Sequence, residues 1–142
     1  MAIELRPAAG EEELSDPAIT GQFASEMAAL AGQAQVPPWC GYIAWRGETP
    51  VGFAGFTGAP SAEGVVELGY LTFPRHEGMG VATAGAAGLV EIARLQGLRA
   101  VIAHTLCEPN ASTRVLEKCG FVRDGFGADP DEGQVWRWKV TL

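Results

Sequence analysis

The sequence predicts an α+β protein in which a mixed β-sheet is flanked by helices, in the order β-α-β-β-β-α-β-α-β-β. Seven short segments have the apolar or alternating pattern of strands, and three have the spacing and capping residues of helices. A helical segment also connects the strands at 65–73 and 99–105, and such a crossover makes neighbouring strands parallel. A length of 142 residues indicates one domain over residues 1–142.

The first half of the chain supplies four strands and one helix. The helix is expected within residues 16–34, where Ser15 or Asp16 caps the start and Pro17 takes the first helical position. A hairpin turn at residues 47–50 joins two of the strands. The strands are expected at residues 2–6, 39–45, 51–57 and 65–73.

The second half begins with a helix at residues 80–96 that is rich in small residues. Glycine inside a helix costs about 1 kcal/mol relative to alanine. Gly85 and Gly88 therefore indicate that this helix packs closely on the sheet. A strand at 99–105 follows, then a short helix at 112–119, and finally a hairpin of the strands at 121–126 and 134–142.

Composition excludes several classes of function. The net charge of −7 argues against nonspecific nucleic-acid binding, which needs clustered Lys and Arg. No apolar run is long enough to cross a membrane, and the N-terminus lacks the pattern of a signal peptide. Three scattered cysteines without a C-x-x-C pair, and two histidines without clustered ligands, predict reduced thiols and no metal site. We expect a cytoplasmic protein.

Residues 75–80 read Arg-His-Glu-Gly-Met-Gly, between a predicted strand and a predicted helix. A glycine-rich turn at a helix start directs several backbone N–H groups to one point, where the helix dipole also favours negative charge. The ligand expected there carries phosphate, and a pyrophosphate fits best. The alternative is a tight turn in which the glycines only permit positive φ.

The glycine spacing narrows the ligand further. A dinucleotide fingerprint that starts at Gly78 would need its third glycine where Thr83 stands. A triphosphate-binding loop from the same start also fails, because Thr83 takes the second glycine position and Ala84 the lysine position. The remaining pattern is R-x-x-G-x-G.

A second motif, N-x-S-x-x-V-L-E-K-x-G-F, occupies residues 110–121. Asn110 has the chemistry of a helix N-cap. Gly120 suits the left-handed residue after the helix, and Phe121 is expected to contact Leu116.

Together these motifs resemble the Gcn5-related N-acetyltransferase (GNAT) superfamily. R-x-x-G-x-G is similar to its acetyl-CoA pyrophosphate loop. The second motif and the Glu67-Leu68-Gly69-Tyr70 segment resemble the branch of the ribosomal-protein N-terminal acetyltransferases (RimJ/RimL-like). The predicted element order is also that of the superfamily. The resemblance implies transfer of acetyl from the co-substrate acetyl-CoA to a primary amine, a peptide N-terminus or a small amine, by direct attack in a ternary complex.

The resemblance also implies a set of cofactor-binding residues. Backbone N–H groups of residues 77–82 would hold the pyrophosphate, and the pantetheine arm would pair with the strand ahead of the loop. Arg75 is alternatively a solvated cation. Asn110 is alternatively only a cap, because in the register of many relatives Pro109 takes the position of the binding Asn. The residues implied are Leu71, Thr72, Phe73, Arg75, Glu77, Gly78, Met79, Gly80, Val81, Ala82 and Asn110.

The catalytic residues expected are Glu67 and Ser112. Glu67 would act as general base, directly or through water, and is alternatively a carboxylate paired with an arginine. The resemblance implies that Ser112 contacts the thiolate; it is alternatively a helix-start hydroxyl that satisfies local N–H groups. Leu116 stands where many family members have a tyrosine that acts as the general acid. Tyr70 and His104 are further candidates.

Two readings compete with an enzyme, and the acceptor stays open. A catalytically silent acyl-CoA binding or sensing module is the main alternative, supported by Leu116 and the register of Asn110. A nucleotide-binding regulatory domain is disfavoured by the glycine spacing. The acidic net charge is compatible with a cationic amine acceptor and also with a role in solubility alone. Trp136 and Trp138 share one face of the last strand, where they fill the core, line the amine pocket or form a homodimer contact.

Overall fold

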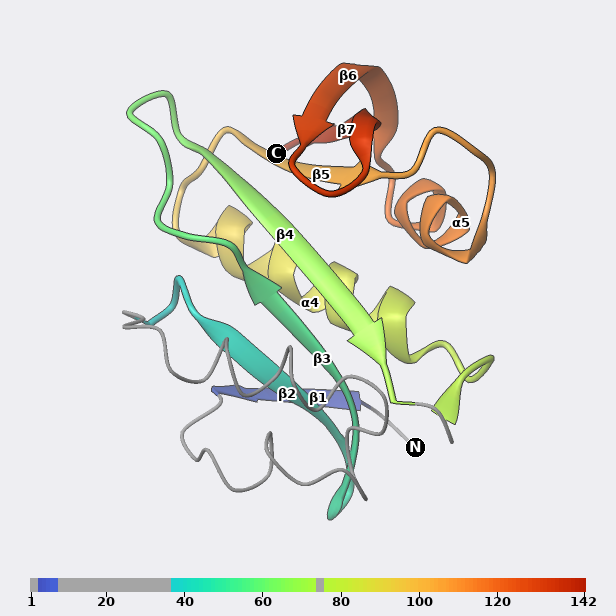
Figure 1. The fold of residues 1–142 in the computed structure, drawn as a ribbon. Helices are drawn as coiled ribbons and strands as arrows, with labels where there is room; N and C mark the ends of the chain where they lie inside the picture. The colour runs from blue at the N-terminus through green and yellow to red at the C-terminus, as the bar shows by residue number, and fades with distance from the viewer. Residues whose placement is uncertain (1–2, 8–36, 74–75) are drawn as a thin grey trace.

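The computed structural model describes residues 3–7, 37–73 and 76–142, and its described strands form one sheet in the order β1-β2-β3-β4-β5-β7-β6 (Figure 1). This confirms the predicted α+β class. The helix predicted within residues 16–34 lies outside the described residues. The strands are β1 (Ile3–Pro7), β2 (Gly41–Arg46), β3 (Thr49–Phe56), β4 (Val65–Thr72), β5 (Ala100–Thr105), β6 (Val122–Asp129) and β7 (Gly133–Thr141), and the described helices are α4 (Val81–Leu95) and α5 (Ala111–Lys118).

The pairing of the strands is mixed, as predicted. Strands β1 to β4 pair antiparallel in sequence order, β4 and β5 are parallel, and β6 and β7 form an antiparallel hairpin with β7 next to β5. In the described part of the chain, the registered pairs of β4 with β5 run only from Val65–Ala100 to Glu67–Ile102. Beyond Glu67 one edge of β4 continues to Thr72 without a registered partner strand, while its other edge stays paired to β3.

Helix α4 packs behind β3 and β4, and α5 lies beside its first turns (Figure 1). A Cβ atom at Gly85 would lie 3.0 Å from the Cβ of Ala54, and one at Gly88 would lie 2.7 Å from Leu5 Cδ1. Because neither distance leaves room for a side chain without movement, the expected close approach of this helix to the sheet is confirmed. Burial of Val81 and Leu89 on the same helix face fixes α4 against the core.

Helix α5 has the capping residues that the sequence predicts, and its bounds, Ala111–Lys118, lie one residue earlier than the predicted 112–119. The side-chain oxygen of Asn110 accepts a hydrogen bond from Thr113 N, and the Thr113 hydroxyl in turn accepts one from Asn110 N. Gly120 has a φ of 86°, and Phe121 N donates to the carbonyl of Leu116. Leu116 and Phe121 are both buried in the main core. This capping holds the first turn of α5 next to the open edge of β4.

The tryptophans of the last strand belong to the core. Trp138 is 6% exposed, and its indole N–H donates to the Thr105 hydroxyl. Trp136 packs edge-on against Trp138 and carries the guanidinium of Arg123 over its ring. The packing role is thus confirmed for Trp138, whereas a homodimer stays a prediction. No helix in the described ranges is long and apolar enough to cross a lipid bilayer.

Candidate active site

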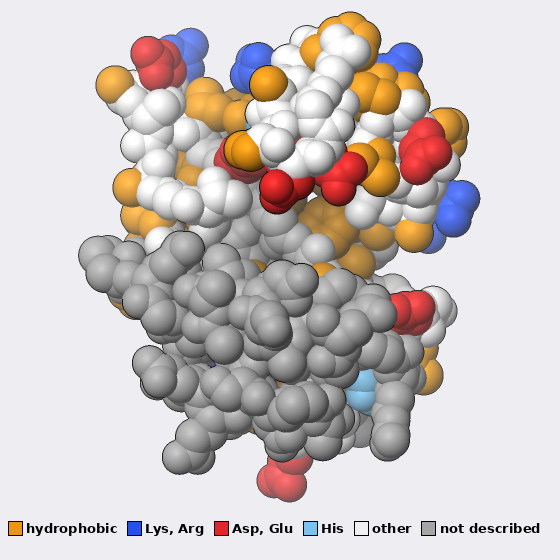
Figure 2. Space-filling model, in the orientation of Figure 1, with side chains coloured by type: hydrophobic (Ala, Val, Ile, Leu, Met, Phe, Trp, Pro, Cys, Tyr) orange, Lys and Arg blue, Asp and Glu red, His pale blue; other side chains and the backbone are white. Residues whose placement is uncertain are grey.

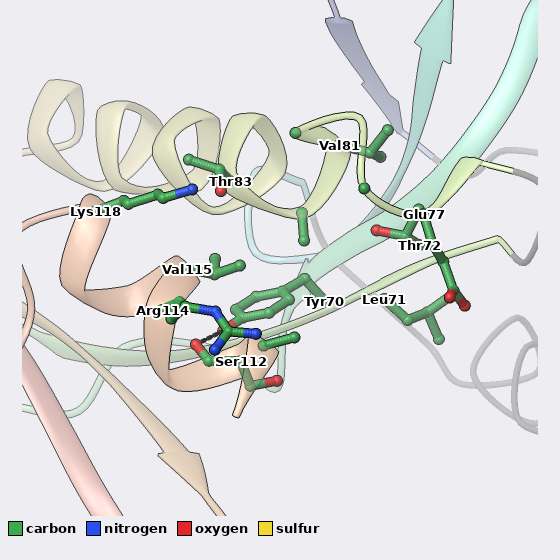
Figure 3. Close-up of a pocket in the computed structure, with 14 residues that line it drawn as sticks. Tyr70, Leu71, Thr72, Glu77, Val81, Thr83, Ser112, Arg114, Val115 and Lys118 are labelled. Atoms are coloured by element: carbon green, nitrogen blue, oxygen red, sulfur yellow. Dashed lines mark hydrogen bonds between the residues drawn. The ribbon is translucent and has the colours of Figure 1, made fainter. Parts of the chain in front are cut away.

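A cavity of about 660 Å³ lies between the end of β4, the start of α4 and one face of α5 (Figure 3). Many residues that the motifs predicted for cofactor binding line it. They are Leu71, Thr72, Glu77, Gly78, Gly80, Val81 and Ala82. Ser112 lines the same cavity from α5. The structure therefore brings the glycine-rich turn, the β4 edge and the start of α5 around one space.

The start of α4 has the chemistry of an anion site. Gly78 and Gly80 have φ values of 78° and 77°, and a Cβ at either would meet nothing within 4 Å. Gly80 is the N-cap, and no side chain caps this helix end. The first N–H groups of a helix lack intrahelical partners, so an uncapped start leaves them available to a ligand. Together with the helix dipole, this arrangement suits a phosphate group.

Three of the described residues predicted to bind the cofactor do not line the cavity. Phe73 is 1% exposed, and its N–H donates to the Val51 carbonyl. Met79 is exposed, and its sulfur accepts a hydrogen bond from Arg46. Asn110 uses its side-chain oxygen as the cap of α5. Arg75 lies outside the described residues.

The cavity also contains residues that the sequence reasoning missed. Arg114 and Lys118 line it from α5, together with Thr83 and Val115. The two basic residues are four positions apart, which places them on one face of a helix. That spacing was visible in the sequence, but nothing in the sequence showed which face of α5 meets α4.

Tyr70 connects β4 to α5 at the inner side of the cavity. Its hydroxyl donates a hydrogen bond of 3.0 Å to the Ser112 carbonyl (Figure 3). Burial of the ring raises the pKa of Tyr70 to about 12, against a smaller opposing effect of the bond to Ser112. A phenol with this pKa stays protonated at neutral pH and is a weak acid, so Tyr70 serves first as a fixed hydrogen-bond donor.

The tyrosines give a prediction for alkaline pH. The chain has two, Tyr42 and Tyr70, and burial raises the pKa of each to about 12. At pH 11 an unperturbed tyrosine is roughly 90% ionised, so a spectrophotometric titration should show little tyrosinate in the folded protein and full ionisation in denaturant. Because the unfolded chain loses these protons first, the free energy of unfolding should fall as pH rises from about 10 to 12. Normal titration near pH 10 in the folded state would contradict the burial of both rings, and Tyr70→Phe assigns the amplitudes.

Glu67 does not line this cavity. It is the last residue of β4 with a registered partner on β5. Its carboxylate is 2.8 Å from Nδ1 of His104, and both side chains are about one-third exposed, at 35% and 28%. Glu67 also lines a second cavity of about 490 Å³ with Ile102 and Arg137. The alternative in which Glu67 pairs with an arginine is not found in the described part of the chain, where Arg137 lies 3.8 Å from Asp124 instead.

The β6–β7 hairpin lies close to this Glu67–His104 pair. A Cβ at Gly127 would come within 2.7 Å of the His104 ring, so glycine at this position makes room for the imidazole. The turn carries Asp129, Asp131 and Glu132, and Figure 2 shows acidic side chains gathered where this hairpin lies. Hydrogen bonds from the N–H groups of Glu132 and Asp131 lower the pKa of Asp129. The turn is therefore negatively charged at neutral pH.

Within the described ranges, no group of three or more His, Cys, Asp or Glu is arranged to hold a metal ion. The cavity instead offers backbone N–H groups, a strand edge and two cations. This set suits an elongated ligand with phosphate groups at one end.

Comparison with known structures supports the fold. The microcin C7 self-immunity acetyltransferase MccE, solved with acetyl-CoA and AMP, has a TM-score of 0.81 at 15% identity, covering 99% of this chain and 93% of that one. A spermidine N-acetyltransferase SpeG chimera from Vibrio cholerae and hSSAT has a TM-score of 0.80 at 14% identity, with 99% and 96% covered. Mycobacterium smegmatis RimJ, in complex with CoA-disulfide, has a TM-score of 0.73 at 20% identity, with 99% and 82% covered.

Sequence comparison identifies the family. No curated protein sequence matches the chain. Residues 7–122, however, match the family model of the acetyltransferase (GNAT) domain. This match covers most of the 142 residues and includes β4, the glycine-rich turn, α4 and α5. The chain therefore belongs to the GNAT acetyltransferases, which are acetyl-CoA-dependent acyltransferases.

Proposed function

We propose that this protein, acting as a single domain, transfers the acetyl group of acetyl-CoA to a primary amine by direct attack in a ternary complex. The observation that carries the proposal is the 660 Å³ cavity, which joins the uncapped start of α4 to the open edge of β4. That edge ends at Glu67, where the second cavity begins. In this proposal the donor binds in the first cavity and the acceptor in the second, and the two meet at the Glu67 end of this edge.

The start of α4 would hold the pyrophosphate of the co-substrate. Glycine at positions 78 and 80 lets the ligand approach the backbone closely, and the N–H groups of Val81 and Ala82 supply donors. The pantetheine arm would lie along Leu71 and Thr72, because that edge of β4 has no registered strand partner in the described sheet. Main-chain pairing of this kind depends little on side-chain identity.

Acetyl transfer needs a neutral amine and a protonated leaving group. Glu67 would take a proton from the bound ammonium, directly or through a water molecule. The neutral amine nitrogen then bonds to the acetyl carbon as the carbon–sulfur bond breaks, and the second proton that this nitrogen gives up passes to the thiolate, directly or through a water molecule. Ser112 lines the cavity and is the proposed contact of that sulfur. Holding donor and acceptor together supplies a large part of the rate enhancement.

The acidic β6–β7 turn supports a cationic acceptor. A protonated amine is attracted to Asp129, Asp131 and Glu132 before it reaches Glu67. Peptide N-termini and small amines both satisfy this chemistry. The motifs shared with the RimJ/RimL-like branch favour a peptide N-terminus, whereas the likeness to a spermidine N-acetyltransferase favours a small polyamine.

A catalytically silent acyl-CoA sensor is the second candidate. It is favoured by Leu116, which is fully buried and stands in place of the tyrosine that commonly acts as the general acid. It is also favoured by Tyr70, whose proton is already engaged by the Ser112 carbonyl and whose pKa is raised to about 12.

A thiol-release assay separates the two candidates. The protein is incubated with acetyl-CoA and a panel of peptides, polyamines and aminoglycosides, free CoA is measured, and acetylated products are identified by mass spectrometry. An enzyme releases CoA above the amine-free blank and yields an acetylated amine. Thermal stabilisation by acetyl-CoA without any product would instead indicate the sensor, and a failure to bind acetyl-CoA would contradict both.

A further inference from the structure

Arg114 and Lys118 form a cationic side of the main cavity. They lie four residues apart on α5, and both line the cavity opposite the start of α4 (Figure 3). The Lys118 side chain reaches toward Thr83 of α4 in Figure 3. A hydrogen bond from the Cys119 thiol to the Thr83 carbonyl also places this end of α5 beside the first turn of α4.

These two cations have no carboxylate partner in the described part of the chain. The ion pairs found there join Arg6 to Glu4, Arg94 to Glu91, His104 to Glu67 and Arg137 to Asp124. The whole chain has 10 Lys and Arg against 17 Asp and Glu. Other basic residues of the described chain, such as Arg46, also lack an acidic partner, but among the described Lys and Arg only Arg114 and Lys118 line the main cavity. These two side chains therefore face a space suited to an anion.

Coenzyme A carries more phosphate than the start of α4 can hold. Its diphosphate joins the pantetheine arm to the 5′-oxygen of the ribose, and a separate phosphate is attached to the 3′-oxygen. A phosphate monoester carries a charge of about −1.5 to −2 at neutral pH. If the diphosphate lies on the α4 N–H groups, the 3′-phosphate lies one sugar away, and among the described helices α5 is the other one that borders the cavity.

We propose that Arg114 and Lys118 form a subsite for the 3′-phosphate of coenzyme A. The planar guanidinium of Arg114 can donate two hydrogen bonds to phosphate oxygens, and the ammonium of Lys118 acts as a point charge. The protein thereby selects coenzyme A thioesters over donors that lack this phosphate. This inference rests on the proposed function, because it takes the cavity as the acetyl-CoA site.

The test compares coenzyme A with 3′-dephospho-coenzyme A by calorimetry. A charge-assisted contact at a partly exposed site predicts that the wild-type protein binds coenzyme A about 10-fold more tightly than the dephospho form. Arg114→Ala and Lys118→Ala should each reduce this preference, and the double variant should abolish it. The loss should come from weaker binding of coenzyme A, with the affinity for the dephospho form nearly unchanged.

A charge-matched control is the double variant Arg94→Ala with Arg99→Ala. These two arginines lie in the last turn of α4 and just after it, away from the cavity, and their removal changes the net charge by the same amount. The control should keep the wild-type preference. A thermal unfolding scan of each variant verifies that it is folded.

Three outcomes would overturn the proposal. Equal affinity of the wild-type protein for both ligands would show that the 3′-phosphate has no subsite, while the proposed acetyl transfer would stand. An equal loss of affinity for both ligands in the double variant would show that the two cations bind the diphosphate instead. Failure to bind either ligand would remove this inference and the proposed function together.

Discussion

Replacing Gly80 with Glu should abolish acetyl-CoA binding while leaving the protein folded. Gly80 is the N-cap of α4, lines the main cavity and has open space around its Cα. The new carboxylate would lie where the diphosphate is expected and would be stabilised by the same helix start. Juxtaposed like charges cost several kcal/mol, so calorimetry should show a loss of affinity of about 100-fold or more.

Two controls separate charge from backbone strain. Gly80 has a φ of 77°, where any other residue is strained by about 1–2 kcal/mol. Gly97 has a φ of 78°, also in open space, but lies beyond the far end of α4. Gly97→Glu should therefore lower stability by a similar amount and keep acetyl-CoA binding. Gly80→Gln introduces the same strain without the charge and should bind better than Gly80→Glu. If Gly80→Glu binds acetyl-CoA normally, the diphosphate does not lie at the start of α4.

Replacing Glu67 with Gln should lower turnover by about 100-fold, the lower part of the range for loss of general-base catalysis. Gln keeps the size of the side chain and its ability to accept a hydrogen bond from His104 Nδ1, but it cannot take a proton from the acceptor amine. Glu67 does not line the main cavity, so the dissociation constant of acetyl-CoA should stay close to the wild-type value. Steady-state kinetics with an identified acceptor and calorimetry with acetyl-CoA measure the two quantities.

Glu63→Gln is the matched control for this variant. Glu63 lines the same second cavity as Glu67 and carries the same charge, but it belongs to the turn before β4. Its neutralisation should leave kcat near the wild-type value, because it is not hydrogen-bonded to His104 and does not lie where β4 and β5 diverge. Unchanged turnover in Glu67→Gln would remove Glu67 from the mechanism.

The described elements were largely predictable from the sequence, because their signals are local. Asn110 and Gly120 mark the two ends of α5 by capping chemistry, and both roles are present in the structure. The helical crossover between β4 and β5 predicted their parallel pairing correctly. The insertion of β7 between β5 and β6 was not predicted, since it depends on which strand of a hairpin meets the sheet.

Only the part of the candidate site that depends on backbone conformation was predictable from the sequence. Gly78 and Gly80 predicted a turn that leaves room for a ligand, and both residues line the cavity. Arg114 and Lys118 gave no comparable signal, because basic residues on a short helix usually face solvent. The pairing of Glu67 with His104 joins residues 37 positions apart through the register of two strands. Such contacts follow from tertiary packing, which motifs do not encode.

The open edge of β4 has a consequence for the behaviour of the protein in solution. Unpaired strand edges invite association with other chains and are a common origin of aggregation. In this protein the edge faces a cavity between two helices, and the Tyr70 hydroxyl ties it to the Ser112 carbonyl of α5. A narrow, extended ligand fits between these helices, whereas a β-strand of another protein molecule would collide with them. In the described sheet, this arrangement leaves part of β4 without a strand partner at a position where helices limit the access of another chain.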